Sequence, residues 1–251
     1  PDLSIITNVS LDHQEFLGNT IEAIAKEKAG IIKSCTPVVI GEYDDKSFPV
    51  FERTTKELNS QLVKAFDLIL PKDLISENDV NYVLLNKQTA YSAIMMLDKL
   101  GYSISKDKLK HVFSNFMSLW QLKGRWQLLH TKPLVYCDTG HNEAGVKLLA
   151  NRLKNYSKMN IHIIWGMSSD KDVSRILRLL PQKASYYFCQ AAIPRAMKAI
   201  ELQKNALDFG LLGVIEKDVN KAILLAKKSA KKDDLIIVGG STFVVAEING
   251  L

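Results

Sequence analysis

In the second half of the chain, short apolar runs alternate with longer amphipathic stretches. The apolar runs have the length of buried strands and cover residues 134–138, 161–166, 185–189, 212–215 and 235–240. Between them, apolar residues recur at helical spacing in the stretches 143–156, 173–180, 195–209 and 219–230. This alternation predicts a doubly wound α/β domain with a largely parallel sheet. Ligands of such domains bind beyond the carboxyl ends of the strands, so residues just after each run are the first candidates for function.

The first half of the chain has a less regular pattern. Strand-like runs are expected at 5–9 and 37–41, and helices at 19–32, 47–59, 86–100 and 105–115. Residues 118–129 lack a clear period, and Gly124 interrupts them. We therefore expect two domains, residues 1–122 as the trailing part of a larger α/β domain and residues 123–251 as a smaller one. Because the chain starts at Pro1 directly before a strand-like run, we expect an upstream piece to be absent.

The composition is that of an ordinary soluble globular protein, with 47% hydrophobic and 24% charged residues. No apolar run approaches the roughly 20 residues that cross a bilayer, and the first residues do not resemble a signal peptide, so we expect a cytoplasmic protein. The net charge of +6 comes from dispersed basic residues and identifies no partner. Cys35, Cys137 and Cys189 are too few for a disulfide framework and are expected to be reduced core residues.

An Asp-His pair follows the first strand-like run, and Lys28 comes fifteen residues after His13. Imidazole and carboxylate groups just beyond a strand end can ligate a cation or orient a phosphate. The residues alone leave a second interpretation open, in which His13 makes a local hydrogen bond and Lys28 is a solvated cation near a helix end.

A second polar cluster follows the run 134–138 and precedes a helix-like stretch. Asp138 could accept a hydrogen bond from a ribose hydroxyl, and His141 and Asn142 would lie at a helix N-terminus, where anionic groups bind. Alternatively, Asn142 caps the helix and Asp138 accepts from amides of the turn. The residues do not decide between a ligand site and these structural roles.

Further polar residues stand between the two halves and after other strand-like runs. Arg125, in the segment KGRW, could form a bidentate clamp on a phosphate or a surface ion pair. Asp170, Arg195 and Ser241 each follow an apolar run, where each could equally be a cap or turn residue.

The order of these motifs carries more information than any one of them. LDHxxxLG, EKAGI, an Asn-x-x-Thr helix start from Asn86 to Thr89, GRW, DxGHN, DKD, PRA and GGS follow one another along nearly the whole chain. The series resembles the folylpolyglutamate synthase and dihydrofolate synthase family of the Mur ligase superfamily, and LDHxxxLG with EKAGI is its most specific part. The resemblance implies the trailing part of a Mur-ligase-type central ATPase domain, followed by a smaller Rossmann-like C-terminal α/β domain.

The resemblance assigns three residues to the magnesium site and to the site of the reacting groups. His13 matches a magnesium ligand, Lys28 matches a lysine that is carbamylated near a second metal, and His141 matches a position near the reacting phosphate and glutamate. A carbamate turns the ammonium of Lys28 into a carboxylate-like anion that can stabilise magnesium. A catalytic role is thus implied for Lys28 and His141.

The remaining matches concern nucleotide and substrate. Asn86, Arg125 and Asp138 match residues that contact ATP, and Ser241 matches one that handles glutamate. The implied cofactors are ATP and Mg²⁺, and the implied substrates are dihydropteroate or a reduced folate together with L-glutamate. We expect a monomer that binds neither nucleic acid nor membrane.

The sequence departs from the family in two places. The family has DGAHNP where this chain runs from Asp138 to Glu143, so Thr139 replaces a glycine and Glu143 replaces a helix-initial proline. No GxxxxGK[ST] loop occurs in the sequence, although such a loop cradles the transferred phosphate. We therefore expect the 251 residues alone to be inactive.

The activity that the resemblance implies is ATP-dependent amide ligation. ATP phosphorylates a folate carboxylate to an acyl phosphate, which the amine of glutamate then attacks, and phosphate leaves. Adding the first glutamate to dihydropteroate and extending the tail of reduced folates share this chemistry, and the sequence does not separate them. Two alternatives are a Mur-type ligase that adds an amino acid to a cell-wall precursor, and a non-catalytic α/β module that binds a nucleotide or a protein partner.

Overall fold

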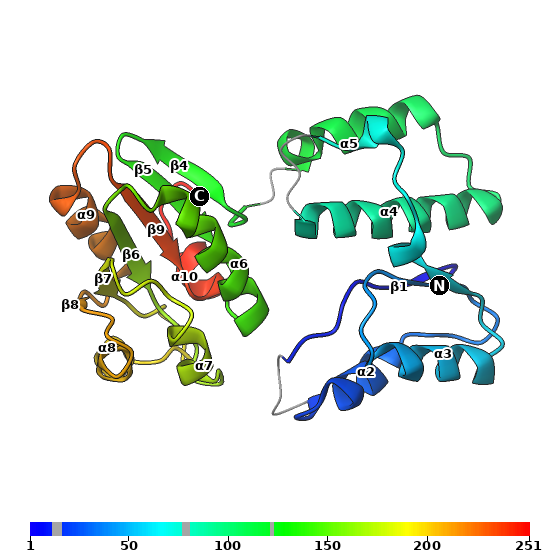
Figure 1. The fold of residues 1–251 in the computed structure, drawn as a ribbon, viewed down its shortest axis with the longest axis horizontal. Coiled ribbons are helices and arrows are strands. Elements are labelled where there is room, and N and C mark those ends of the chain that lie inside the picture. Colours follow the sequence, from blue (N-terminus) through cyan, green and yellow to red (C-terminus); the bar gives the residue numbers. More distant parts are fainter. Residues whose placement is uncertain (12–16, 77–80, 121–122) are drawn as a thin grey trace. The chain divides into compact units, whose positions relative to one another are not determined.

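The structure is a computed structural model that describes residues 1–11, 17–76, 81–120 and 123–251, with the backbone alone at residues 81 and 116–120. The chain divides into two compact units, Pro1–Gln121 and Leu122–Leu251 (Figure 1). None of the described helices combines the length and the apolar character that a membrane span requires.

The first unit is built around a parallel three-stranded sheet in the order β1-β2-β3. The strands are β1 (Ser4–Ile6), β2 (Val38–Ile40) and β3 (Leu62–Lys64). One face is covered by α2 (Ile21–Ala29) and α3 (Phe48–Glu57), whose apolar residues form a core with Ile6, Val38 and Ile40. α2 begins where Thr20 Oγ1 accepts a hydrogen bond from Ala23 N–H at 3.1 Å, which satisfies one of the first amides of the helix.

The opposite face of this sheet is covered by α4 (Asn81–Lys99) (Figure 1). Ala93 of α4 packs there against Val39 and Ala65. Two 3₁₀ turns, η1 (Ala65–Asp67) and η2 (Lys72–Leu74), follow β3, and α5 (Lys106–Trp120) packs on η2 and α4 through Phe113.

The helix start expected at Asn86 is wrong. α4 begins at Asn81, so Asn86 lies inside the helix, and its side chain is exposed. Thr89 Oγ1 does not take part in a cap but donates to the Leu85 carbonyl, one turn back, at 2.8 Å. Asn86 and Thr89 therefore lie inside a longer helix rather than at its beginning.

The second unit contains a six-stranded sheet in the order β4-β5-β9-β6-β7-β8. The strands are β4 (Gln127–Thr131), β5 (Leu134–Asp138), β6 (Ile161–Trp165), β7 (Ser185–Phe188), β8 (Gly213–Ile215) and β9 (Leu235–Gly239). All neighbours pair in parallel except β4, which forms an antiparallel hairpin with β5. The predicted α/β fold with a largely parallel sheet is confirmed.

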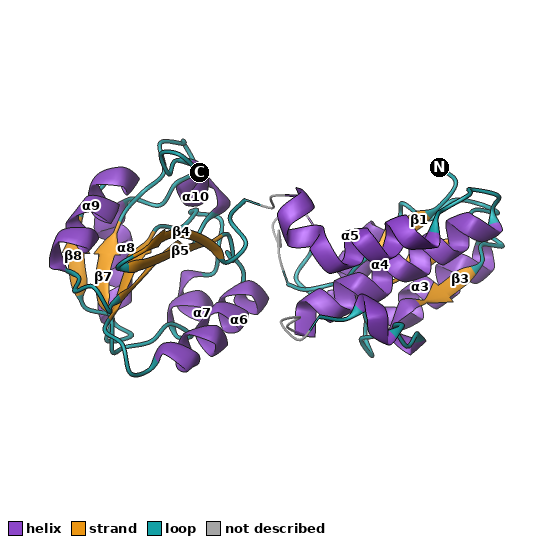
Figure 2. Ribbon diagram, turned by 90° about the horizontal axis from the view of Figure 1, so that it is seen from above, coloured by secondary structure: helices purple, strands orange, loops and turns teal. Residues whose placement is uncertain are grey.

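Helices cover both faces of this sheet, and Figure 2 shows α6 and α7 on one side and α9 and α10 on the other. The helices are α6 (Glu143–Leu153), which η3 (Lys154–Tyr156) extends, α7 (Val173–Leu177), α8 (Ala199–Leu207), α9 (Val219–Ser229) and α10 (Thr242–Ala246). Along β6, Ile163 and Trp165 join the core with α6, α7 and α8, whereas Ile164 joins the core with α9 and α10. This alternation is why both faces of the strand are buried.

Some elements have no counterpart in the predicted pattern. The aperiodic stretch 118–129 contains the end of α5 and the start of β4, and α10 follows Ser241 directly. Cys137 and Cys189 are buried as expected, whereas Cys35 is exposed, and none of the three forms a disulfide. The expectation of a core position is therefore wrong for Cys35.

Candidate functional site

The carboxyl ends of three neighbouring strands lie together in the second unit. β9 runs between β5 and β6, and Asp138 of β5 and Trp165 of β6 both pair with Gly239. The backbones approach so closely that a Cβ atom on Gly239 would lie 2.9 Å from the Asp138 carbonyl oxygen. The loop after Asp138 and the loop that leads from Gly239 to Ser241 are therefore neighbours at the edge where ligands of parallel sheets bind.

The carboxylate of Asp138 joins two loops through backbone amides. Its Oδ1 accepts from Gly140 N–H at 2.8 Å, and its Oδ2 accepts from Trp126 N–H at 3.0 Å. In addition, the Gly124 carbonyl accepts from Thr139 N–H at 2.7 Å. These bonds hold the KGRW segment against the DTGHN loop, so Asp138 does satisfy turn amides. Each carboxylate oxygen can accept a second hydrogen bond, so this structural role leaves room for a donor from a ligand.

His141 and Asn142 lie at the N-terminus of α6. Asn142 Oδ1 accepts from Gly145 N–H at 2.8 Å and caps the helix. His141 Nδ1 lies 3.0 Å from the Thr139 carbonyl oxygen, which can only accept, so Nδ1 carries the proton of this bond. In the neutral ring the lone pair is then on Nε2. The loop thus places His141 near the start of an 11-residue helix, where backbone amides favour anions.

Ser241 follows the turn after β9 and is buried. Its Oγ accepts from Phe243 N–H at 3.2 Å and caps α10. Gly240 before it has φ 91°, and a Cβ atom there would lie 2.5 Å from the Gly166 carbonyl oxygen, so this turn requires glycine. As a cap, the Ser241 hydroxyl accepts one bond and keeps its own proton to donate.

Arg125 lies between two residues with left-handed backbone conformations, Gly124 at φ 74° and Trp126 at φ 46°. Gly124 is buried, whereas the Arg125 side chain is exposed. The Trp126 ring stacks on Tyr136 with centroids 4.7 Å apart, and the guanidinium of Arg152 lies 4.7 Å from the centre of the same ring. A fixed backbone that carries an exposed guanidinium suits a phosphate ligand.

In the first unit, Lys28 is half-buried in the last turn of α2, and Asn86 is exposed on α4. His13 lies outside the described residues. Within the described ranges, no three side chains of His, Cys, Asp or Glu gather to hold a metal ion.

The carboxyl ends of β1 and β2 carry polar residues that the motif analysis missed. Asn8 Nδ2 donates to Glu42 Oε1 at 3.2 Å. A Cβ atom on Gly41 would overlap the Thr7 carbonyl and Thr89 Oγ1, so α4 packs directly on this edge of the sheet. Glu42 follows a strand-like run, and the rule that selected Asp138 could have found it.

Family models match both units of the chain. The Mur ligase middle domain matches residues 1–101, and the Mur ligase, glutamate ligase domain, matches residues 124–242. The chain belongs to the Mur ligase family.

Curated relatives within this family are folate enzymes. The dihydrofolate synthase/folylpolyglutamate synthase of Buchnera aphidicola from Schizaphis graminum is 28% identical over an alignment of 263 positions, which covers 98% of this chain and 60% of that protein. The protein of the same name from Escherichia coli K12 is 26% identical over an alignment of 258 positions, which covers 98% of this chain and 59% of the relative. The Mur ligase chain therefore spans about 60% of the length of these relatives.

Solved structures of the same enzymes resemble the chain. E. coli FolC in complex with DHPP and ADP has a TM-score of 0.77 at 25% identity and matches 98% of this chain and 60% of its own. A bifunctional folylpolyglutamate synthase/dihydrofolate synthase with Mn, AMPPNP and L-glutamate bound has a TM-score of 0.78 at 27% identity, with the same coverage. The predicted membership of the folylpolyglutamate and dihydrofolate synthase family is confirmed.

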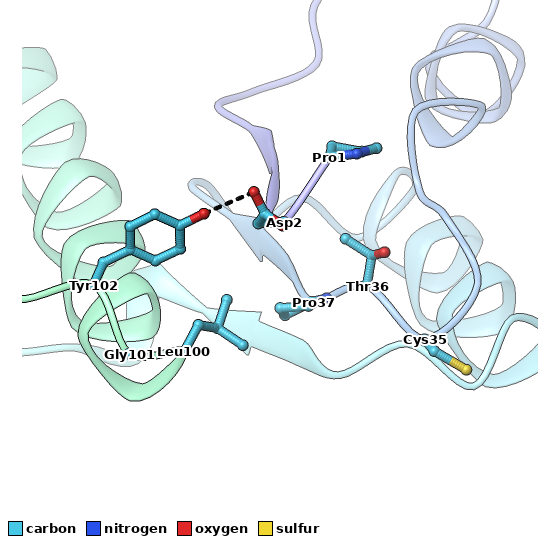
Figure 3. A pocket seen from close by; sticks show the side chains of 8 residues that line it. All are labelled: Pro1, Asp2, Cys35, Thr36, Pro37, Leu100, Gly101 and Tyr102. Carbon is cyan, nitrogen blue, oxygen red and sulfur yellow. Dashed lines mark hydrogen bonds between the residues drawn. The ribbon is translucent and has the colours of Figure 1, made fainter.

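A hollow of about 410 Å³ lies in the first unit of this Mur ligase chain (Figure 3). It is lined by Pro1 and Asp2 before β1, residues 35–37 before β2, and residues 100–102 after α4. The Tyr102 hydroxyl donates to Asp2 Oδ2 across it at 2.8 Å. The hollow is at the amino ends of the strands, the opposite edge from the one where parallel sheets bind nucleotides, so it is not the candidate site.

A buried polar cluster occupies the amino edge of the second sheet. Asp234 accepts from Lys231 N–H at 2.7 Å, from Asn160 Nδ2 at 3.0 Å and from His162 Nε2 at 3.4 Å. His162 Nδ1 faces the Tyr187 hydroxyl at 3.1 Å. Burial raises the pKa of Asp234, but these hydrogen bonds outweigh it and hold the pKa below its usual value. Because the cluster is at the amino edge, it supports the fold of the Mur ligase C-terminal unit and not the site.

Proposed function

We propose that the protein is an ATP-dependent amide ligase that adds L-glutamate to dihydropteroate, to the glutamate tail of reduced folates, or to both. One observation carries this proposal: in a chain of the Mur ligase family, the KGRW, DTGHN and GGS loops meet at the carboxyl edge of one sheet through Asp138 and Gly239. Relatives of this chain include a synthase with AMPPNP and L-glutamate bound, which supports the same ligands here.

Nucleotide binding is assigned to Arg125, Asp138 and Asn86. The exposed guanidinium of Arg125 clamps a phosphate with two parallel hydrogen bonds. Asp138 accepts from a ribose hydroxyl with the lone pairs that Trp126 and Gly140 leave open. Asn86, exposed on α4 one turn before Thr89, offers an amide to the nucleotide.

The reacting groups are assigned to His141, Ser241 and Lys28, and the metal to His13. The Nδ1 proton of His141 bonds the Thr139 carbonyl oxygen, and we assign Nε2 to proton transfer with the phosphate and the incoming amine. Ser241 donates its hydroxyl proton to a carboxylate of glutamate. Lys28, as a carbamate, would offer the oxygen donor that Mg²⁺ prefers. His13, which lies outside the described residues, is assigned to the metal from its place in the LDHxxxLG motif.

ATP and Mg²⁺, when bound, supply the phosphoryl group that activates the folate carboxylate and the positive charge that stabilises its transfer. The chain's own residues bind and orient these groups, but the sequence has no phosphate-cradling glycine loop. We further propose that residues 1–122 are a partial central ATPase domain and residues 123–251 the C-terminal domain, in a cytoplasmic, monomeric enzyme.

The test measures phosphate release by the full-length gene product. Release that requires ATP, glutamate and either dihydropteroate or a reduced folate is expected, whereas the 251 residues alone should release none. Release that instead requires a UDP-sugar acid would identify a cell-wall ligase. Nucleotide binding without any release would refute the ligase and favour a binding module.

A matched pair of variants tests the phosphate clamp. Arg125→Lys keeps the charge but loses the bidentate geometry, so the KM for ATP should rise about tenfold or more. Lys147→Arg, a surface change on α6, is the control and should leave the KM unaltered. An unchanged KM in Arg125→Lys would remove Arg125 from the site.

A further inference from the structure

We propose that Trp126 is a positioning residue that fixes the backbone at Arg125, a role whose consequence for ATP rests on the proposed function. The proposal starts from an unusual backbone conformation. Trp126 has φ 46°, in the left-handed region that bulky side chains rarely adopt. Such strain persists only where the surroundings enforce it, and it concentrates at functional sites.

A backbone hydrogen bond and contacts of the ring enforce the conformation of Trp126. Its N–H donates to Asp138 Oδ2 at 3.0 Å. Its ring stacks on Tyr136 of β5 with an angle of 19° between the planes, and Arg152 of α6 covers the ring as a cation–π partner at 4.7 Å. The residue is thereby held to the strand and to the helix that flank the DTGHN loop.

Arg125 is fixed from its other side as well. Gly124 N–H donates to Gln127 Oε1 at 2.8 Å, and the Gly124 carbonyl accepts from Thr139 N–H at 2.7 Å. With both neighbours held, Arg125 keeps only the freedom of its side chain. A ligand that it binds then costs less ordering entropy, because the backbone is already set.

A purely structural anchor would behave differently. If Trp126 only filled space between Tyr136 and Arg152, its loss would lower the melting temperature without a selective effect at Arg125. The loss of a positioning residue instead frees one peptide segment and weakens ATP binding through Arg125 alone. The two roles therefore differ in local backbone mobility and in the coupling between the two residues.

The first measurement reports on the backbone without catalysis. Trypsin cleaves the Arg125–Trp126 bond only when that segment opens, and mass spectrometry identifies the cut. Arg152→Met leaves this bond unchanged but removes the cation from the ring, so cleavage should accelerate about tenfold. Leu202→Ala is the control, because Leu202 of α8 is buried in the core of the second unit and its truncation should raise proteolysis without preference for Arg125. Unselective cleavage in both variants would overturn the proposal.

The second measurement links the segment to ATP in the full-length protein. Trp126→Gly should raise the KM for ATP about tenfold, and the double variant with Arg125→Ala should match Arg125→Ala alone. Trp126→Phe, which keeps a ring, should restore part of the loss. Independent, multiplying effects would overturn the proposal. If cleavage is faster but Arg125→Ala leaves the KM for ATP unchanged, the positioning role of Trp126 is supported and the nucleotide role of Arg125 is refuted.

Discussion

The substitution Gly124→Ala tests how tightly the KGRW loop fits against the DTGHN loop. Gly124 has φ 74°, which costs an L-residue about 1–2 kcal/mol. The new Cβ atom would also lie 2.6 Å from Thr139 Cγ2 and 2.9 Å from Val245 Cγ1. Overpacking of this kind costs about 1–3 kcal/mol, so the total destabilisation should be about 2–5 kcal/mol.

Thr139→Ser separates the two contributions because it deletes the methyl group that the new Cβ atom meets. In the wild-type background this deletion removes a buried methyl group and should cost about 1 kcal/mol. In the Gly124→Ala background the same deletion relieves the overlap and should recover about 1 kcal/mol. The sign of the Thr139→Ser effect should therefore reverse between the two backgrounds.

The assay is thermal unfolding of the four proteins by calorimetry. Gly124→Ala should lower the transition of the second unit by on the order of 10 °C and leave the first unit unaffected. Wild-type stability in Gly124→Ala would refute the close approach of the two loops. An equal Thr139→Ser effect in both backgrounds would refute the contact between Thr139 and position 124.

Other features of the second unit and of Cys35 give predictions that simple measurements check. Folding lowers the pKa of Asp234. The carboxylate therefore stabilises the fold fully above its unfolded pKa, near 4, and this stabilisation is lost as the pH falls through the folded pKa. Asp234→Asn should flatten that part of the plot of unfolding free energy against pH. Asn142→Ala removes the cap of α6 and should lower the free energy of unfolding by about 1 kcal/mol in urea titrations. Burial raises the pKa of Cys137 to about 11 and that of Cys189 further, so a thiol reagent at pH 8 should label Cys35 first; equal rates would contradict the burial.

The regular elements of the second unit could be predicted because apolar runs and helical spacing follow from burial on both faces of a parallel sheet. β4 was not predicted because this edge strand is largely exposed and carries the polar residues Gln127, His130 and Thr131, so it lacks the apolar run of a buried strand. The early start of α4 was missed because propensity marks a helix terminus less clearly than its interior, and Asn86 looked like a cap.

The candidate site was predictable only in part. Asp138 and Ser241 could be selected because Asp138 ends one strand-like run and Ser241 follows another, and the parallel pairing with β9 brings their loops together. No sequence pattern reports that Asp138 accepts from Trp126 N–H, because that bond depends on the left-handed turn at residues 124–126. Left-handed backbone at a tryptophan is a property of its surroundings, not of its own preference.

Thr139 and Glu143, which differ from the DGAHNP motif, each make favourable contacts in the loop. The side chain of Thr139 fits beside Gly124, where a Cβ atom would lie 2.6 Å from Thr139 Cγ2. Asn142 caps α6, and the carboxylate of Glu143 in the first turn interacts favourably with the helix dipole. The loop of this chain therefore accommodates Thr139 and Glu143 while Asp138 and Asn142 keep their hydrogen bonds.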